Sequence, residues 1–230
     1  IIAGKSATIF DPDSTVTTQE AAKMLLVTLG YDAETAGLVG AGWGTKTNAL
    51  ADENGLLKDV NNGTTQGLPR QYAAQIIYNA INAYTVVYRD GAYTNWTSNG
   101  DEHLPTVGER YMDLVKVTGT LVASGKVGLN GAGAEEELVL ENLSDADIAA
   151  GKESSFNDVT EDYSDMLGQK VQVLYKENND DVTVYGVFAT DDNEVLIETT
   201  ANELDTVSEA NKIKVNGTNY TVDMSRKYDV

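Results

Sequence analysis

Cysteine is absent from the 230-residue chain, and histidine occurs once. Without cysteine the chain has no disulfide, no thiolate nucleophile and no Cys-ligated zinc or iron–sulfur site. The redox compartment stays open, because a protein of this size folds without disulfides. His103 has no second histidine or cysteine with which to bind zinc, so we interpret it as a loop residue.

Basic residues and long apolar runs are also scarce. The chain has 16 Lys and Arg against 36 Asp and Glu, which gives a net charge of -20 and a pI near 4.2. This field repels polyanions, and no cluster of Lys and Arg opposes it, so we expect no nucleic-acid partner. The apolar runs are shorter than the roughly 20 residues that a spanning helix needs, so we expect no membrane span.

Motifs of common enzyme classes are missing as well. No G-x-S-x-G, H-E-x-x-H or phosphate-binding P-loop occurs in the sequence. A pair of carboxylates for glycoside hydrolysis stays open, because sequence spacing does not identify such a pair among 36 acidic residues. We predict that the chain is not an enzyme and holds no cofactor, apart from a weak Ca²⁺ site.

The hydrophobic period and the charge divide the chain into two parts. Residues 1–84 follow a helical period and carry eight acidic and five basic side chains. The remainder carries 28 acidic and 11 basic side chains and alternates from about Val115. We therefore predict a helical region at 1–84, a connector at 85–110 and an acidic β-rich domain at 111–230.

The stretch "STVTTQEAAKMLLVTLGY" has the features of a capped helix. Thr17 and Glu20 have the spacing of a capping box, in which a hydroxyl and a carboxylate satisfy the first backbone N–H groups. Gly30 ends the helix, because glycine readily takes a left-handed conformation. One face is apolar at helical spacing. Its residues are Ala21, Met24, Leu25, Thr28 and Leu29.

A shift of about 52 residues reproduces this apolar face. The second set is Ala73, Ile76, Ile77, Ala80 and Ile81. Pro69 stands where Thr17 stood, and proline suits the first turn of a helix. We interpret the match as an internal repeat of two helices that pack side by side around a shared core. A shorter helix is predicted between them, from about Thr47 to Asn54.

The second part predicts an antiparallel sheet. Alternating apolar residues mark strands near 115–123, 171–175 and 182–188. Asn216-Gly217 lies between two alternating runs and predicts a tight hairpin. Ser144 caps a predicted short helix. The fold class is therefore predicted as α+β, with N-terminal helical repeats followed by a small antiparallel β-domain that is barrel-like or half-open.

The opening stretch resembles the S-layer homology domain, whose repeats carry an F-x-P-D turn followed by an I-T-R-A-E helix start. The residues that carry the resemblance are Phe10, Pro12, Asp13, Val16, Thr17, Glu20 and Leu29-Gly30-Tyr31. The stretch "GLPRQYAAQIIYNAI" resembles the start of a next repeat. The resemblance covers residues 1–83, about one and a half repeats.

The resemblance implies a helical bundle whose grooves bind a secondary polysaccharide of the bacterial cell wall, often through a ketal-pyruvylated sugar. The motif arginine is a forked donor suited to the acidic sugar. Arg70 matches it in the second repeat, whereas Thr18 takes its place in the first and Tyr72 replaces the motif glutamate. Arg70, Asp13 and Glu20 are the predicted ligand-binding residues. Arg70 as a solvent-facing residue is the open alternative.

Two further groups of residues have open interpretations. Asp11 and Asp13 are weak candidates for Ca²⁺, or they build the turn before the helix. Tyr93 and Trp96, three residues apart, form a sugar-stacking platform or the packing of a hairpin.

We expect a non-enzymatic, extracellular bacterial protein, anchored to the cell wall or part of an S-layer. Its partners are the secondary cell wall polysaccharide and, in a surface layer, copies of itself, and the β-domain has a structural or assembly role. The alternatives are an accessory region of a large extracellular polysaccharide-degrading enzyme, and a sugar-binding module.

Overall fold

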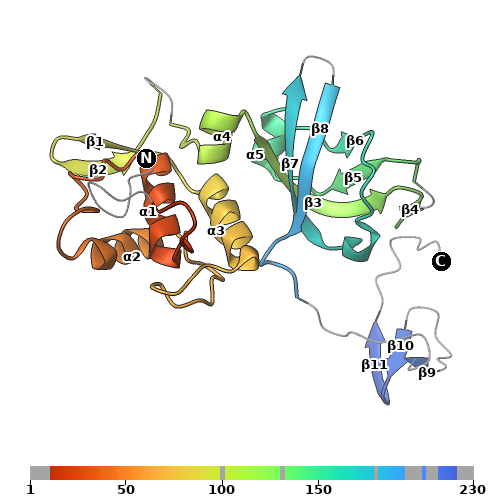
Figure 1. Cartoon of the computed structure of the whole chain (residues 1–230). Helices are drawn as coiled ribbons and strands as arrows, with labels where there is room; N and C mark the ends of the chain where they lie inside the picture. Colours follow the sequence, from red (N-terminus) through yellow and green to blue (C-terminus); the bar gives the residue numbers. More distant parts are fainter. Residues whose placement is uncertain are drawn as a thin grey trace. The chain divides into compact units, whose positions relative to one another are not determined.

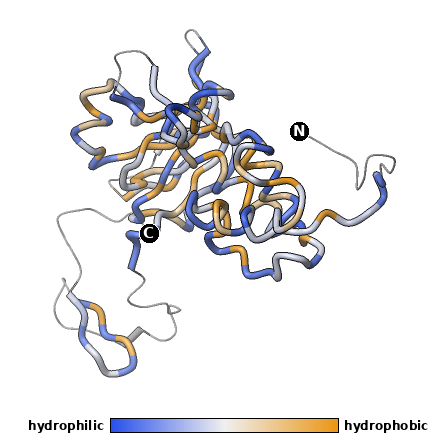
Figure 2. Tube along the Cα trace, turned by 90° about the vertical axis from the view of Figure 1, so that its left-hand side faces the viewer, coloured by the Kyte–Doolittle hydropathy of each residue, from blue (hydrophilic) through white to orange (hydrophobic). Residues whose placement is uncertain are grey.

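The computed structural model describes residues 11–98, 102–129, 133–178, 181–194, 204–205 and 212–221. The chain divides into two compact units, 1–113 and 114–230 (Figure 1). In the described ranges each unit has its own hydrophobic core. Apolar residues lie along the packed helices and strands, and hydrophilic residues gather at the turns (Figure 2). Among the described residues, no helix has the length and apolar character to cross a membrane.

The first unit contains four helices and one β-hairpin in the part that the structure describes. Its elements are α1 (Thr18–Leu29), α2 (Trp43–Glu53), α3 (Arg70–Asn82), β1 (Val86–Arg89), β2 (Ala92–Asn95) and α4 (Val107–Met112). Helix α2 begins four residues before the predicted start at Thr47. The core joins all these helices to β1. Its fully buried large side chains are Leu26, Leu29, Leu38, Leu56 and Ile76.

The predicted ends of α1 are confirmed. The Thr17 side chain accepts a hydrogen bond from the Glu20 N–H, and Glu20 Oε2 accepts one from the Thr17 N–H at 2.8 Å. Gly30 follows the last residue with φ 121°, and an added Cβ there would collide with the carbonyl oxygen of Val86. Glycine is therefore required at this position both by the turn and by the close approach of β1.

The two helices read as repeats do not bury equivalent faces. In α1 the buried apolar residues include Ala22, Leu26 and Leu29, and the corresponding buried residues are Ile76 and Ala80 on α3 and Ala83 directly after it. Each pair is 54 residues apart rather than 52, and two residues correspond to about 200° of rotation around a helix. Ile77, predicted to be buried, is 50% exposed. The helices share a core, but equivalent helical repeats are not shown.

The predicted fold class is thus wrong for the first unit. This unit also contains the hairpin β1–β2, which pairs antiparallel around Asp90-Gly91, where the sequence predicts a turn and a short hairpin in the connector. The surroundings of the two helices also differ. The start of α1 is covered by the segment before α3, where the N–H of Thr18 donates to Gln66 O and the N–H of Leu68 donates to Val16 O. Tertiary packing, not the sequence repeat, determines which face of each helix is buried.

The second unit is dominated by a larger antiparallel sheet with the strand order β6-β5-β3-β7-β8, and β4 pairs with β3. The elements are β3 (Val115–Ser124), β4 (Val127–Gly128), β5 (Leu138–Glu141), α5 (Asp145–Ala149), β6 (Ser155–Phe156), η1 (Ser164–Met166), β7 (Lys170–Asn178) and β8 (Asp181–Ala189). Strands β9 (Leu204–Asp205), β10 (Lys212–Val215) and β11 (Thr218–Thr221) form a separate sheet.

These sheets correct the prediction for the second part. We expected one small barrel-like or half-open domain, whereas the described strands form two sheets, and the pairing in each is an open row. Strand β3 reaches two neighbours by pairing with β7 along residues 115–120 and with β5 along residues 120–124. The hairpin predicted at Asn216-Gly217 is confirmed, with both residues at positive φ. Ser144 caps α5 as predicted.

Lys152 joins α5 to β3 in the second unit. Its Nζ lies 2.7 Å from Asp147 Oδ1 and donates a hydrogen bond to the carbonyl oxygen of Lys116. Ser144 Oγ donates to Asp147 Oδ2 at 2.9 Å. Burial raises the pKa of Asp147, but the hydrogen bonds from Lys152 and Ser144 outweigh it and hold the pKa below its ordinary value of 3.8. The ion pair therefore stabilises this unit when Asp147 is charged.

The collision at Gly30 predicts a measurable difference between two glycine substitutions. Gly30→Ala is expected to lower the free energy of unfolding of the first unit by about 2–4 kcal/mol, through backbone strain and the collision with Val86. Gly55→Ala is the matched control, because Gly55 has φ 70° but no atom within 4 Å of an added Cβ, and about 1–2 kcal/mol is expected. Both tryptophans lie in this unit, so urea unfolding followed by their fluorescence measures it. Equal losses in the two variants would contradict the assigned role of the Val86 contact.

The Lys152 ion pair predicts a pH-dependent loss of stability. Lys152→Gln should lower the stability of the second unit by about 1–2 kcal/mol at neutral pH. A carboxyl with a depressed folded pKa contributes stability above its ordinary value of 3.8, and this stability is lost as the pH falls through the folded pKa. The difference from wild type should therefore shrink below about pH 4. Hydrogen exchange of peptides from β3 and β7 measures this unit.

Lys126→Gln is the control for that experiment. Lys126 lies 3.0 Å from Glu135, but the two side chains are 70% and 74% exposed. Solvent screens such a pair, so a change below about 0.5 kcal/mol is expected. Equal stability of the Lys152 and Lys126 variants would contradict the stabilising role of the ion pair between Lys152 and Asp147.

Candidate functional site

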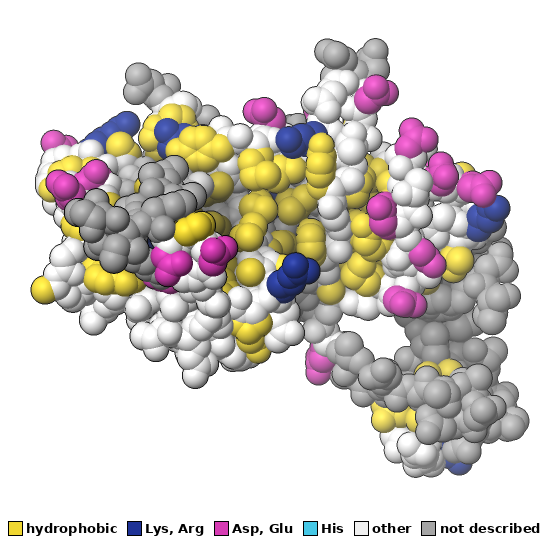
Figure 3. Space-filling model, viewed as in Figure 1, with side chains coloured by type: hydrophobic (Ala, Val, Ile, Leu, Met, Phe, Trp, Pro, Cys, Tyr) yellow, Lys and Arg dark blue, Asp and Glu magenta, His cyan; other side chains and the backbone are white. Residues whose placement is uncertain are grey.

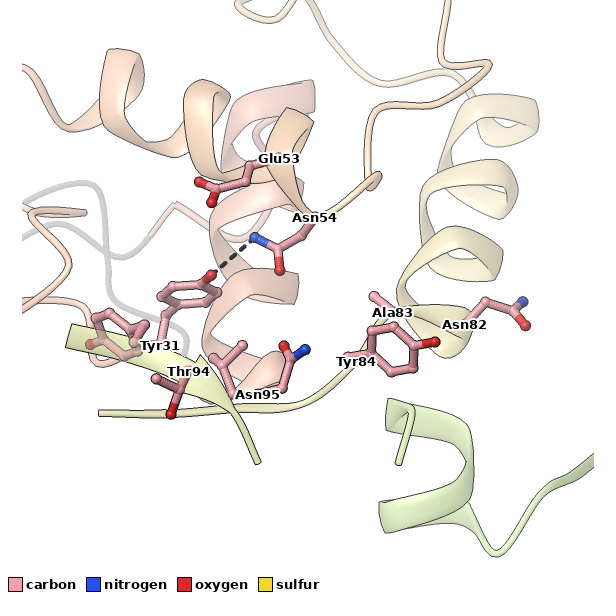
Figure 4. A pocket seen from close by; sticks show the side chains of 10 residues that line it. Tyr31, Glu53, Asn54, Asn82, Ala83, Tyr84, Thr94 and Asn95 are labelled. Atoms are coloured by element: carbon pink, nitrogen blue, oxygen red, sulfur yellow. Dashed lines mark hydrogen bonds between the residues drawn. The ribbon is translucent and has the colours of Figure 1, made fainter. Parts of the chain in front are cut away.

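The ends of three helices and one hairpin surround a pocket in the first unit (Figure 4). It has a volume of about 570 Å³, which is within the range of small-ligand sites. The lining follows the C-terminal ends of α1, α2 and α3 and the facing strands. The lining residues are Tyr31, Glu53, Asn54, Asn82, Ala83, Tyr84, Val86, Tyr93, Thr94 and Asn95.

Tyr31 is held in place by the turn that ends α1. The N–H of Tyr31 donates to Leu26 O at 3.1 Å, so the chain folds back after Gly30, and the side chain is buried. Its hydroxyl accepts a hydrogen bond from Asn54 Nδ2 at 3.0 Å (Figure 4). Asn54 is fixed in turn, because the same amide donates to Leu50 O. One wall of the pocket is therefore rigid.

The tyrosines of the hairpin extend this wall. The rings of Tyr31 and Tyr93 are 4.5 Å apart between centroids, and those of Tyr88 and Tyr93 are 5.1 Å apart. The Tyr93 hydroxyl accepts from the Asp32 N–H at 2.9 Å. Tilted ring pairs at these distances are favourable. The three rings form one continuous aromatic row, of which Tyr31 and Tyr93 line the pocket.

Tyr84 lies on the side of the pocket opposite Tyr31 (Figure 4). Its side chain is 51% exposed, which leaves the ring accessible to a ligand. The backbone beneath it is fixed, because Tyr84 pairs with Thr106 and the N–H of Thr85 donates to Pro105 O at 3.1 Å. Tyr84 therefore combines a defined position with an open surface.

The described lining of the pocket carries one formal charge, which is negative. Glu53 is the one charged side chain among its lining residues. Burial raises the pKa of Tyr31 above its ordinary value of 10.0; the hydrogen bond from Asn54 lowers it, and the charge of Glu53 raises it further. The site thus offers aromatic surfaces, amide donors and acceptors, and one carboxylate. These groups suit a ligand with many hydroxyl groups.

The predicted ligand residues lie away from this pocket. Arg70 is exposed at the first residue of α3, and the pocket lies at the last residue, about 18 Å along the helix. Glu20 is engaged in the cap of α1, where its Oε2 also accepts from Thr17 Oγ1 at 2.9 Å. The bridge between Thr17 and Gly67 brings the start of α1 near the segment that leads into Arg70.

Thr18, which stands in place of the motif arginine in the first predicted repeat, has a structural role. Thr18 is buried, and its Oγ1 accepts a hydrogen bond from Asn62 Nδ2 at 2.9 Å. The same amide donates to Gly67 O, which fastens the segment before α3 over the start of α1. The position of Thr18 is closed to a ligand, whereas that of Arg70 is open.

Asp11 and Asp13 are exposed in the turn before α1. Ser14 Oγ donates to the carbonyl oxygen of Asp11 at 3.1 Å, which is a turn contact. Within the described ranges, no group of three or more acidic or histidine side chains has the arrangement of a metal site. Phe10, which opens the F-x-P-D motif, lies outside the described residues.

Tyr93 and Trp96 contact different partners. Tyr93 packs against Tyr31 and Tyr88, whereas the Trp96 ring stacks on the guanidinium of Arg110 at 3.9 Å. The proposed shared platform is therefore not formed by these two residues.

Asn54, Asn82 and Tyr84 line the pocket but are not among the site residues predicted from the sequence. They lie at or directly after helix ends, and the ends of three helices meet only in the tertiary structure. A usable signal was present, because each of the three predicted helices ends beside a tyrosine or an asparagine.

No protein-family model, curated protein or solved structure matches the chain. The likeness to S-layer homology repeats therefore rests on the motif residues themselves. The assignment of the pocket as a candidate site depends on the geometry of this chain alone.

The two tyrosines on opposite sides of the pocket differ in their predicted contribution to stability. Tyr31→Ala should lower the free energy of unfolding of the first unit by about 3 kcal/mol, because it removes a buried ring. Tyr84→Ala should change it by less than about 0.5 kcal/mol, since the ring is half-exposed. Urea unfolding followed by tryptophan fluorescence measures both. A large loss in Tyr84→Ala would mean that its ring is part of the core and not a free surface.

Proposed function

We propose that this chain is a non-enzymatic segment of an extracellular bacterial surface protein, and that its first unit binds a cell wall polysaccharide through the pocket at the helix ends. The observation that carries the proposal is the pairing of the rigid Tyr31 wall with the accessible Tyr84 ring across a pocket of about 570 Å³. The second unit has a structural or assembly role.

The chemistry of the lining supports a glycan ligand. Sugar rings present apolar C–H faces and a rim of hydroxyl groups. Tyrosine offers a large apolar ring with a polar tip, and asparagine offers both a donor and an acceptor. Glu53, Asn54 and Asn95 lie at the pocket with such polar groups. A few placed polar groups in an aromatic pocket are typical of small-molecule recognition.

The same lining favours binding over hydrolysis. Most glycoside hydrolases place two carboxylates on either side of the scissile bond. The described lining of this pocket contains one carboxylate, that of Glu53. The proposal of a non-enzymatic role rests on this arrangement together with the absence of common catalytic motifs.

Two sequence features support the location at the bacterial surface. The motif around Pro12, Asp13 and Glu20 resembles S-layer homology repeats, which attach proteins to wall polysaccharides. The net charge of -20 disfavours a polyanionic partner such as nucleic acid. On the face drawn in Figure 3, the basic side chains do not merge into a continuous patch.

Binding of purified wall polysaccharide to the whole chain tests the proposal. Wild type should be retained on the immobilised polymer, and Tyr84→Ala should weaken binding about tenfold, because loss of one stacking surface costs roughly 1–2 kcal/mol. Isothermal titration with the soluble polymer gives the affinities.

Tyr185→Ala is the matched control. Tyr185 is 60% exposed and belongs to the second unit, so its loss should leave the affinity unchanged. No binding by wild type, or equal binding by wild type and Tyr84→Ala, would contradict the proposed site.

A further inference from the structure

We infer that the pocket selects uncharged sugar units and discriminates against acidic ones. The inference rests on the proposed function and specifies its ligand class. It differs from the prediction that Arg70 binds the ligand, because an arginine would favour an acidic sugar. Three features of the described residues carry it: the charge of the lining, the orientation of the helices, and a described lining without a basic side chain.

The lining places a negative charge at the ligand without a positive partner. Of the ten lining residues, Glu53 carries the one formal charge, and the others are aromatic, amide, hydroxyl or aliphatic. A carboxylate accepts hydrogen bonds from sugar hydroxyl groups and repels an anionic substituent. An acidic sugar in this pocket would therefore lose hydration and meet no cation among the described lining residues.

The dipoles of the helices make the electrostatic potential at the pocket more negative. The C-terminal end of a helix carries a partial negative charge of about half an elementary charge. The pocket lies at the C-terminal ends of α1, α2 and α3, which contain 12, 11 and 13 residues. None of the three has a basic residue in its last turn. The dipoles of these three helices thus act in the same sense as Glu53.

Neither Arg110 nor Arg70 is a lining residue of the pocket. The guanidinium of Arg110, on α4, stacks on the Trp96 ring at 3.9 Å. Arg70 is too far away to compensate. It lies at the opposite end of α3, about 18 Å from the pocket, which exceeds the Debye length of about 8 Å at physiological ionic strength. The amide oxygen of Asn54 and the amide group of Asn95 remain as neutral polar partners, since Asn54 Nδ2 already donates to Tyr31 and Leu50. This set fits the hydroxyl or N-acetyl groups of an uncharged sugar.

One polymer in two chemical forms tests the inference. The probe is wall polysaccharide that carries ketal-linked pyruvate, used as extracted and after mild acid has removed the pyruvate. The whole chain should bind the uncharged form about threefold to tenfold more tightly at about 20 mM salt. The ratio should decrease at about 300 mM salt, because salt screens the repulsion.

Three variants separate the possible causes. Glu53→Gln should reduce the ratio by about half or more, because it removes the charge that repels the acidic form. The affinity for the uncharged form should also fall, because the carboxylate that accepts hydrogen bonds from its hydroxyl groups is replaced by an amide. Asp52→Gln is the control, because Asp52 lies next to Glu53 on α2 but does not line the pocket. Arg70→Gln should leave both affinities unchanged.

The outcomes distinguish the inference from the proposed function. If Tyr84→Ala weakens binding but the acidic form binds as tightly as the uncharged form or more tightly, the pocket binds glycans and the selectivity is wrong. A loss of binding to the acidic form in Arg70→Gln would move recognition to the start of α3. If wild type binds neither form, or if Tyr84→Ala changes neither affinity, the proposed function fails and the inference fails with it.

Discussion

The close approach of Gly30 to the carbonyl oxygen of Val86 is the constraint on which the first unit depends. Helix α1 ends at a residue without a side chain, so the first strand of the hairpin can lie directly against that helix end. The same turn directs Tyr31 back toward α2, where Asn54 donates to its hydroxyl. A side chain at position 30 would push the hairpin away and separate the two walls of the pocket. One backbone contact therefore fixes both the packing of the unit and the geometry of its candidate site.

The pocket follows from how helices end. The last turns of helices have unpaired carbonyl groups, and asparagine, glycine and tyrosine at these positions complete or cover them. When three helices end at one place, the polar groups that serve as caps also become neighbours. This explains why the site contains amides. Glu53 at the end of α2, and last turns without a basic residue in α1, α2 and α3, run against the usual preference of helix C-termini for cations. This arrangement gives the site a negative potential that the motif arginine, at the other end of α3, does not oppose.

The predictions made from local sequence and the structure agree on the ends of α1 and differ on the repeat. The capping box of Thr17 and Glu20, the stop at Gly30 and the hairpin at Asn216-Gly217 were predictable because they depend on residues close in sequence. The equivalence of α1 and α3 failed because burial depends on neighbours. Thr18 is covered by the segment held through Asn62, whereas α3 leaves Ile77 half-exposed. The separation of the described C-terminal strands into two sheets likewise depends on pairing partners distant in the chain.

By itself the sequence determined the acidic character of the chain, the change from helical to alternating periodicity, and the turns and caps at Thr17, Gly30 and Ser144. These features are local, because a cap or a turn needs only a few consecutive residues and charge needs only composition. The tertiary structure decided which helix faces are buried, which strands pair, and that Tyr31, Asn54 and Tyr84 surround one pocket. Each of these depends on contacts between segments far apart in the chain, and sequence periodicity carries no information on which segments meet.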